Sequence, residues 1–399
     1  MLMKRGSALA AAAACALLAA CAAAPESARL PGTGWLAVSA NDNKVVLIDG
    51  VLTVLSNPPP DTLALIDLKQ NPPKLVAEID MPAGTVDGPP GSVAVTPDEG
   101  LALVASGLKI NPADPARQVD DNRVIVVDLK ANPPKVIATL VSGARPTGIA
   151  ITPDGRFALV ANRGDGTVAV LSINGKEVTK IDTVRIADDK SGPVHVAITP
   201  DGKSALVTRD GDSRVSVLAI ENGRVTYTRR DMRAGIQPYH MSMNPSGRNA
   251  VVGVNGRGGV GDIDTISVID LSRKPYRVVE TVSVDQWVEG LVFSPDGRHV
   301  AVVAMNGSNR PRNYPFYNDA GKLVMFRLDG MKLTRVAEAP IGHWSQGVVF
   351  SPDGKTILVG NMVEKNLGVY GFDGTNLTDT GQRIAVKGGA AALSTAGGR

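Results

Sequence analysis

The chain has 399 residues, with 42 Lys or Arg against 39 Asp or Glu, so its formal net charge is only +3. The charges are interspersed and form no basic stripe of the kind that binds nucleic acid. Aromatic residues make up 4% of the chain, too few for platforms that stack single-stranded bases.

The first residues have the features of an export signal. Lys4 and Arg5 precede an apolar run from Ala8 to Ala20, which is too short to span a bilayer as a helix. The run ends in Leu18-Ala19-Ala20-Cys21, which resembles the lipobox of bacterial lipoprotein signal peptides.

This resemblance implies a signal peptide over residues 1–20, lipids on Cys21 and a short tether over residues 21–33. Ala22 follows the cysteine where Asp would retain a lipoprotein at the inner membrane, so we expect the periplasmic face of the outer membrane. An ordinary secretory signal with a chance cysteine is the alternative. The body after Cys21 has no cysteine, so it has no disulfide and no thiolate nucleophile.

A self-similar unit then recurs about every 50 residues, which is typical of propeller blades. Each copy places a Pro-Asp-Gly turn, or a near copy, between two short strands of alternating polarity, as in IAITPDGRFALVAN from Ile149. A third strand such as Val168 to Ile173 and a more polar fourth strand such as Lys135 to Leu140 complete four strands per blade. The turn prolines are Pro97, Pro153, Pro200, Pro245, Pro295 and Pro352.

A seventh unit is divided between the two ends of the chain. Trp35 to Ala40 matches a second strand, and Gly389 to Gly397 matches a first strand whose turn has eroded. We therefore predict an all-β, seven-bladed propeller of four-stranded antiparallel blades, forming one domain over residues 34–399, in which the C-terminal strand completes the N-terminal blade. Six or eight blades are the alternatives, because Lys44 to Pro60 contains extra strand-like residues that we interpret as an insertion.

The units Pro146 to Asn162 and Glu289 to Asn306 resemble those of the YVTN-repeat and lactonase-like propeller superfamily. The resemblance extends over roughly Gly34 to Thr395 and implies the propeller fold. Relatives include sugar-lactone hydrolases, a muconate-lactonizing cyclase, surface-layer proteins and periplasmic proteins without an established activity. The resemblance implies no single function among these, because one fold supports many.

Candidate site residues emerge when the blades are aligned on the turn proline. First strands line the channel of a propeller, so residues just before them lie at its mouth. The positions five, six and eight residues before the proline differ from blade to blade and collect chemically distinctive side chains. They include His195 and His240 (five before), Thr147, Tyr239, Glu289 and Gln346 (six before), and Arg145, Trp287 and Trp344 (eight before), with His343 beside Trp344.

Polar groups that converge beside aromatic walls are typical of a small-molecule site. For lactone hydrolysis, His195, His240 or Glu289 supplies a base and Arg145 stabilises the oxyanion. We expect Tyr239, Trp287, Trp344, Gln346, His343 and Thr147 to contact the ligand. The alternative is a wet channel mouth whose polar groups have no ligand. A metal held by His195, His240 and Glu289 is a further alternative, but we predict no metal and no cofactor.

Three other patterns carry less weight. Gly256 to Gly261 matches G-x-G-x-x-G, but a strand follows it where a dinucleotide site needs a helix. Asp210-Gly211-Asp212 has too few acids for a calcium loop. The inserts Gly107 to Asp121 and Asn306 to Asp319 are expected to be long loops, and the second could cap the channel.

Three functions follow as hypotheses. The first is a monomeric, membrane-anchored periplasmic protein that binds a small molecule or a protein partner at the channel mouth without turnover. The second is a lactonase-like hydrolase or isomerase using the same residues. The third is a structural or assembly scaffold that uses blade edges and loops.

Overall fold

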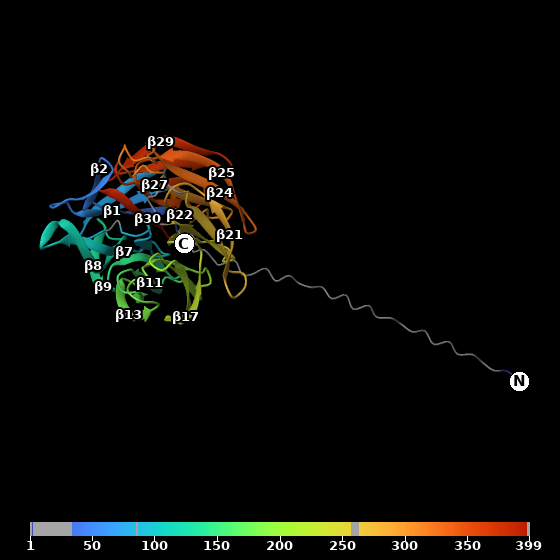
Figure 1. The fold of residues 1–399 in the computed structure, drawn as a ribbon. Helices are drawn as coiled ribbons and strands as arrows, with labels where there is room; N and C mark the ends of the chain where they lie inside the picture. The colour runs from blue at the N-terminus through green and yellow to red at the C-terminus, as the bar shows by residue number, and fades with distance from the viewer. Residues whose placement is uncertain (1, 3–33, 85–86, 257–262, 397–399) are drawn as a thin grey trace.

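The computed structural model describes residue 2 and residues 34–84, 87–256 and 263–396. Most of the predicted signal peptide, the whole predicted tether with Cys21, and most of the glycine motif at Gly256 to Gly261 lie outside these residues. Within them the chain forms a ring of sheets around one axis (Figure 1). No helix among the described residues is long and apolar enough to cross a membrane.

Seven four-stranded antiparallel sheets make the ring, which confirms the predicted fold. The blades are numbered along the chain, and strands are given from the axis outwards. Blade 1 contains β30 (Gly389–Thr395), β1 (Leu36–Asp42), β4 (Asp61–Asp67) and β5 (Lys74–Met81); blade 2 contains β6 (Val93–Val95), β7 (Leu101–Asn111), β8 (Asp114–Asp128) and β9 (Lys135–Val141). Blade 3 contains β10 (Pro146–Ile151), β11 (Phe157–Asn162), β12 (Thr167–Asn174) and β13 (Glu177–Arg185); blade 4 contains β14 (Pro193–Ile198), β15 (Ser204–Arg209), β16 (Arg214–Glu221) and β17 (Arg224–Met232). Blade 5 contains β18 (Pro238–Met243), β19 (Asn249–Val254), β20 (Thr265–Asp270) and β21 (Arg277–Ser283); blade 6 contains β22 (Val288–Phe293), β23 (His299–Ala304), β24 (Gly321–Asp329) and β25 (Lys332–Ile341); blade 7 contains β26 (Ser345–Phe350), β27 (Thr356–Asn361), β28 (Asn366–Phe372) and β29 (Leu377–Ala385).

The two ends of the chain close the ring. β30 pairs with β1 in antiparallel register, with Ala37 opposite Thr395 and Asp42 opposite Gly389. The C-terminal strand therefore becomes the innermost strand of the N-terminal blade, as the divided repeat predicts. Because β30 pairs with β1, the inner edge of β1 is not left unpaired, and the ring is held closed by backbone hydrogen bonds.

The turn residues act as their chemistry predicts. In blade 3, the Asp154 carboxylate accepts hydrogen bonds from the Thr152 hydroxyl at 2.6 Å and the Arg156 amide at 3.1 Å. Gly155 has a φ of 73°, a conformation that glycine adopts without steric cost. These turns lie at one end of the channel, called the turn end below, and the first strands begin at the other end, called the mouth.

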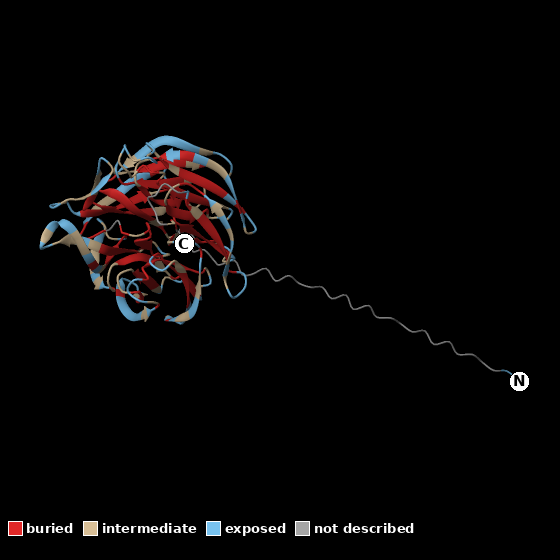
Figure 2. Ribbon diagram, in the orientation of Figure 1, coloured by how far each residue is buried: buried red, intermediate tan, exposed pale blue. Residues whose placement is uncertain are grey.

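Apolar side chains are packed between neighbouring blades. Leu103 and Ala105 of blade 2, for example, form one buried cluster with Ile149 and Val160 of blade 3. Burial falls from the inner strands to the outermost ones, which are pale blue in Figure 2. The core is thus a set of seven inter-blade layers, and the residues at the mouth contribute little to it.

The insertions differ from expectation in one respect. Lys44 to Pro60 does form an extra hairpin, β2 (Val45–Ile48) with β3 (Val51–Val54), outside the blade sheets. The insert Gly107 to Asp121 is not a loop, because β7 and β8 extend their pairing as far as Asn111 and Asp114. The insert Asn306 to Asp319 is irregular, as predicted. It lies against the β2–β3 turn, because a Cβ added at Gly50 of that turn would overlap backbone atoms of Arg310 and Pro311 in the insert.

Candidate functional site

The first strand of five blades carries an irregularity at the mouth. In four of them, its pairing with the second strand shifts register between the residues seven and four before the turn proline, for example between Pro238 and Met241, and in blade 4 between the residues seven and five before it. In those four blades two residues thus lie in a bulge, and bulges often redirect side chains next to functional sites. The bulged positions are those of Tyr239 and His240 in blade 5 and of Glu289 and Gly290 in blade 6.

The residue eight before the proline has a positive φ in five blades. In blade 4 this residue is glycine, which adopts such a φ without strain, so the backbone is strained in the other four. A left-handed backbone costs other residues about 1–2 kcal/mol each, and such strain concentrates at functional sites. The affected residues are Arg145 (φ 55°), Gln237 (54°), Trp287 (56°) and Trp344 (50°).

A further position contributes to the mouth that the sequence analysis did not find. The residue ten after the proline follows the second strand, and its amide donates to the carbonyl of the residue eight before the proline, across the hairpin. These bonds are Arg163 to Arg145 at 2.8 Å, Asp210 to Gly192 at 3.0 Å, Asn255 to Gln237 at 3.2 Å and Met305 to Trp287 at 3.0 Å. The same alignment on the proline, extended forwards, would have exposed this variable column.

These positions surround a mouth pocket of about 280 Å³. The pocket is lined by the aromatic and amide side chains of three strained positions and by the polar side chains of three bulges. Four residues that follow a second strand, ten after the turn proline, also line it. Asp87 and Gly88 add to it from the loop before β6, and Asn309 from the insert Asn306 to Asp319. The members from the repeat are Gln237, Trp287, Trp344, Tyr239, Glu289, Gln346, Arg163, Asp210, Asn255 and Met305.

Glu289 is the chemically distinctive group of the mouth pocket. Its side chain is 2% exposed, and the indole Nε1 of Trp287 donates to its Oε2 at 2.6 Å. With its amide nitrogen towards Glu289, Gln346 donates to Oε1 at 2.9 Å and accepts from the Trp344 Nε1 at 2.9 Å. Burial raises the pKa of Glu289 to about 8, against the opposing effects of the Trp287 hydrogen bond and the Arg163 charge. A carboxyl group with such a pKa can exchange a proton near neutral pH.

Two uncharged groups that line the mouth pocket with Glu289 can interact with a ligand. Asn255 is 1% exposed, and neither its Oδ1 nor its Nδ2 has a hydrogen-bond partner among the described residues. Such an unpaired buried amide is costly unless a ligand or water completes it. Tyr239 packs edge-on against Trp287 with ring centroids 6.5 Å apart, and burial raises its pKa well above 10, so its hydroxyl stays protonated.

The charges of the mouth are paired with one another. Asp87 accepts two hydrogen bonds from Arg145, at 2.6 and 2.8 Å, and one from Arg163 at 3.0 Å. The other end of the Arg163 guanidinium contacts Asp210 at 2.5 Å. Burial alone would lower the pKa of Arg163, but Asp210 and Asp87 outweigh it and raise that pKa. Among the described residues that line the pocket, Arg163 is the only cation, and both of its ends are occupied.

The structure separates the predicted site residues into three groups. Tyr239, Trp287, Glu289, Trp344 and Gln346 come together in the mouth pocket. His195 and His240 instead line a second cavity along the channel axis, so the predicted single cluster is divided. Among the described residues, no group of three or more His, Cys, Asp or Glu is placed to hold a metal ion.

The third group lies outside both cavities. The Arg145 guanidinium is held by Asp87, and Arg163 rather than Arg145 lines the pocket. Thr147 is fully buried and donates to the Val194 carbonyl at 2.9 Å. His343 contacts Glu364 at 2.6 Å at the rim.

The Asp210-Gly211-Asp212 loop is occupied by ion pairs. Asp210 pairs with Arg163, and Asp212 pairs with Arg209. Both carboxylates are thus already neutralised by arginine, which leaves this loop unlike a calcium site.

Comparisons with known proteins agree with the architecture. Residues 125–237, under a third of the chain, match the family described as "Lactonase, 7-bladed beta-propeller". No curated protein matches the chain. The matched segment contains Arg163 and Asp210 and ends before Tyr239, so it says nothing of Glu289.

Solved structures share the fold at low sequence identity. A protein of Bacteroides fragilis, provisionally assigned as a 6-phosphogluconolactonase, is 16% identical with a TM-score of 0.67 over 91% of this chain and 98% of its own. A periplasmic gluconolactonase of Pseudomonas aeruginosa is 18% identical with a TM-score of 0.60 over 90% and 99%. A protein of unknown function from Desulfotomaculum acetoxidans is 16% identical with a TM-score of 0.64 over 84% and 95%.

Proposed function

We propose that this propeller is a lactonase-type hydrolase whose mouth pocket opens a small lactone to the corresponding hydroxy acid. The buried Glu289 carboxyl, fixed between Trp287 and Gln346, carries the proposal. The family match over residues 125–237 supports the reaction class, and two structurally similar proteins are described as lactonases.

The chemistry requires a base, an attacking water and a stabilised oxyanion. In its ionised form, Glu289 takes a proton from water, and the water oxygen bonds to the lactone carbonyl carbon. The Asn255 amide and the Tyr239 hydroxyl donate to the developing oxyanion. The ring C–O bond then breaks, and the proton on Glu289 passes to the departing alkoxide, which yields a hydroxy acid and regenerates the carboxylate.

The pocket charges favour an uncharged lactone over a phosphorylated one. Arg163 is already shared between Asp87 and Asp210, so a phosphate would meet two carboxylates and no free cation among the described lining residues. The two indoles of Trp287 and Trp344 offer flat apolar walls of the kind that contact sugar-ring faces.

The direct test is hydrolysis of glucono-1,5-lactone by the purified full-length protein, corrected for the spontaneous rate. We expect Glu289→Gln to lower kcat by about 10²–10⁴-fold, as loss of a general base does. Glu177→Gln, at an exposed position at the start of β13, should leave the rate unchanged. If the wild-type protein binds several lactones but hydrolyses none of them faster than Glu289→Gln does, the pocket is a binding site without turnover.

We further infer a lipid anchor at Cys21 and a periplasmic location, from the signal-like segment and its cysteine. Labelling with a radioactive fatty acid in a bacterial host should mark the wild-type protein but not Cys21→Ser. A labelled Cys21→Ser variant, or a wild-type protein without label, would contradict the anchor.

A further inference from the structure

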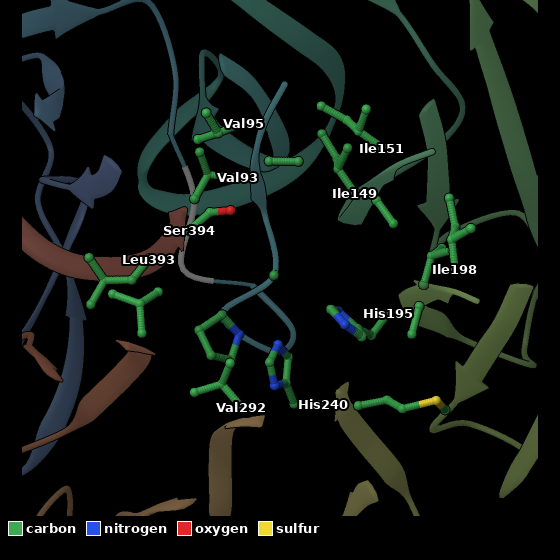
Figure 3. Close-up of a pocket in the computed structure, with 18 of the residues that line it drawn as sticks. Val93, Val95, Ile149, Ile151, His195, Ile198, His240, Val292, Leu393 and Ser394 are labelled. Atoms are coloured by element: carbon green, nitrogen blue, oxygen red, sulfur yellow. The ribbon is translucent and has the colours of Figure 1, made fainter. Parts of the chain in front are cut away.

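A second cavity lies along the first strands, between the mouth pocket and the turn end. Figure 3 shows side chains that line it. Its volume is about 100 Å³, and the first strands of the blades supply most of its walls. Apolar side chains dominate this lining, among them Val93, Ile149, Ile198, Val292 and Leu393. It shares no lining residue with the mouth pocket.

Two histidines form the mouth-side end of this cavity. The ring centroids of His195 and His240 are 4.2 Å apart, and Figure 3 shows the two side chains beside each other. Gly91 lies against them, because a Cβ there would overlap His195 Nδ1 and lie 3.6 Å from His240 Nε2. The Nδ1 of His195 and the Nε2 of His240 thus flank one point of the cavity wall.

The hydrogen bonds of the two rings make these nitrogens complementary. His240 Nδ1 accepts from the Leu291 amide at 3.1 Å, so the hydrogen of its neutral ring is on Nε2. His195 is 7% exposed, and its Nδ1 has no hydrogen-bond partner among the described residues. The His195 ring also hydrogen-bonds with the backbone of Met241. Since Nδ1 has no partner within the described part of the chain, this bond is made by Nε2.

We propose that the channel cavity is a binding site for a small neutral alcohol or phenol, whose hydroxyl donates to His195 Nδ1 and accepts from His240 Nε2–H. A hydroxyl is both donor and acceptor, which neither an amine cation nor a carboxylate is. The body of the ligand then occupies the apolar walls towards the turn end, where Pro97, Pro153 and Ala396 line the cavity. The neutral state of both rings suits an uncharged partner, since burial lowers the pKa of His195 to about 4.

The dimensions are consistent with a compact ligand. An apolar cavity of roughly 150 Å³ in another protein binds benzene, so a cavity of the present size is of the same order. Burying the apolar body supplies most of the affinity, and the hydroxyl adds a hydrogen bond to each histidine. This proposal is independent of lactone hydrolysis, because none of its residues line the mouth pocket.

The test compares phenol with benzene, which share a ring but differ in the hydroxyl, by calorimetry on the full-length protein. We expect phenol to bind about 2–10-fold more tightly, with shifts of the ¹⁵N resonances of His195 and His240. His195→Phe should bind both probes equally, and Val292→Phe, which fills the cavity, should bind neither. Leu75→Phe, at an exposed position of β5, should behave like the wild type.

Three results would overturn the proposal. Equal affinity of wild type for phenol and benzene would remove the hydroxyl clamp. Phenol binding without shifts of the two histidine rings would place the ligand elsewhere. If the wild type binds neither probe, the channel cavity holds only water. This result comes from the wild type, so it does not depend on whether the variants fold.

Discussion

At the scale of single residues, the mouth of this propeller is costly to fold. Four large side chains occupy a left-handed backbone position where blade 4 has Gly192. Three of them, Gln237, Trp287 and Trp344, line the mouth pocket, so the strain coincides with the site. Proteins retain strain of this kind where it positions groups that act on a ligand.

Replacement of Gln237 by glycine tests this trade-off. We expect Gln237→Gly to raise the free energy of unfolding by about 0.5–1 kcal/mol, because relief of the left-handed strain exceeds the added chain entropy of glycine. The affinity for a lactone should fall at the same time, because Gln237 lines the pocket. Urea unfolding measures the first effect, and a loss of stability would contradict it.

Gly192 supplies the matched control in the neighbouring blade. A Cβ at this position would overlap Oδ1 of Asp210. Gly192→Gln should therefore destabilise the protein and disturb the Arg163–Asp210 pair, the opposite of the result for blade 5.

The repeat supplied an alignment from which some residues of the mouth pocket could be predicted. Tyr239, Trp287, Glu289, Trp344 and Gln346, which the alignment singled out because these columns vary while the turns do not, lie together in that pocket. The alignment missed Arg163, Asp210 and Asn255, which lie on the far side of the turn, and it could not separate His240 from Tyr239. That separation depends on the bulge, which sends adjacent residues to different cavities.

At the scale of elements, the hairpin insertion of blade 1 contacts the insert Asn306 to Asp319 of blade 6. The β2–β3 hairpin of blade 1 packs its turn at Gly50 against Arg310 and Pro311, in the insert of blade 6. The same insert contributes Asn309 to the mouth pocket, and its Ser308 hydroxyl accepts from the Trp344 amide at 3.3 Å. The hairpin therefore supports a segment that borders the site.

A side chain at Gly50 should release this contact. In Gly50→Val, we expect the Arg310 and Tyr314 amides, which are bonded within the insert, to exchange hydrogen about tenfold faster, equivalent to ~1.4 kcal/mol. Gly330→Val is the control, because Gly330 also has positive φ but nothing lies within 4 Å of its added Cβ. Equal exchange in the two variants would show that the hairpin does not support the insert.

Elements were predictable where apolar and polar residues alternate and less so elsewhere. The blade strands are confirmed. The strand-like residues within Lys44 to Pro60, interpreted as an insertion, form a separate hairpin outside the blade sheets. Gly107 to Asp121 was predicted as a loop, because it is longer than the corresponding turns of the other blades. It is nevertheless paired, since the backbone ladder between β7 and β8 continues beyond the core and needs no buried face.

At the scale of the whole molecule, the ring depends on its last strand. β30 places Ala390, Ala391, Ala392 and Leu393 in the core and lies beside the channel. The fold was predictable because the repeat is strong and because the missing strand of the first unit recurs at the end of the chain. The pockets were not, since they depend on how side chains from different blades meet.

Removal of β30 should open the ring. Deleting residues 388–399 leaves β1 as an uncovered inner edge and exposes apolar surface of blades 1 and 7. We expect a loss of at least about 4 kcal/mol of unfolding free energy and concentration-dependent aggregation in size-exclusion chromatography. Deletion of 397–399 alone, which leaves β30 intact, should change neither. Unchanged stability of the longer truncation would contradict ring closure as the basis of the fold.

The central claim is that Glu289 works from a buried position as the base of the mouth pocket, and the pH dependence of kcat/KM tests it most directly. Because the base acts when ionised and its pKa is raised to about 8, kcat/KM should increase about tenfold per pH unit up to pH 7 and level off above pH 8. The measurement uses initial rates of lactone opening with the spontaneous rate subtracted at each pH. The account predicts this ascending limb in the wild type and its absence in Glu289→Gln. A wild-type profile that is flat between pH 6 and 8, or one whose limb survives in Glu289→Gln, would contradict it.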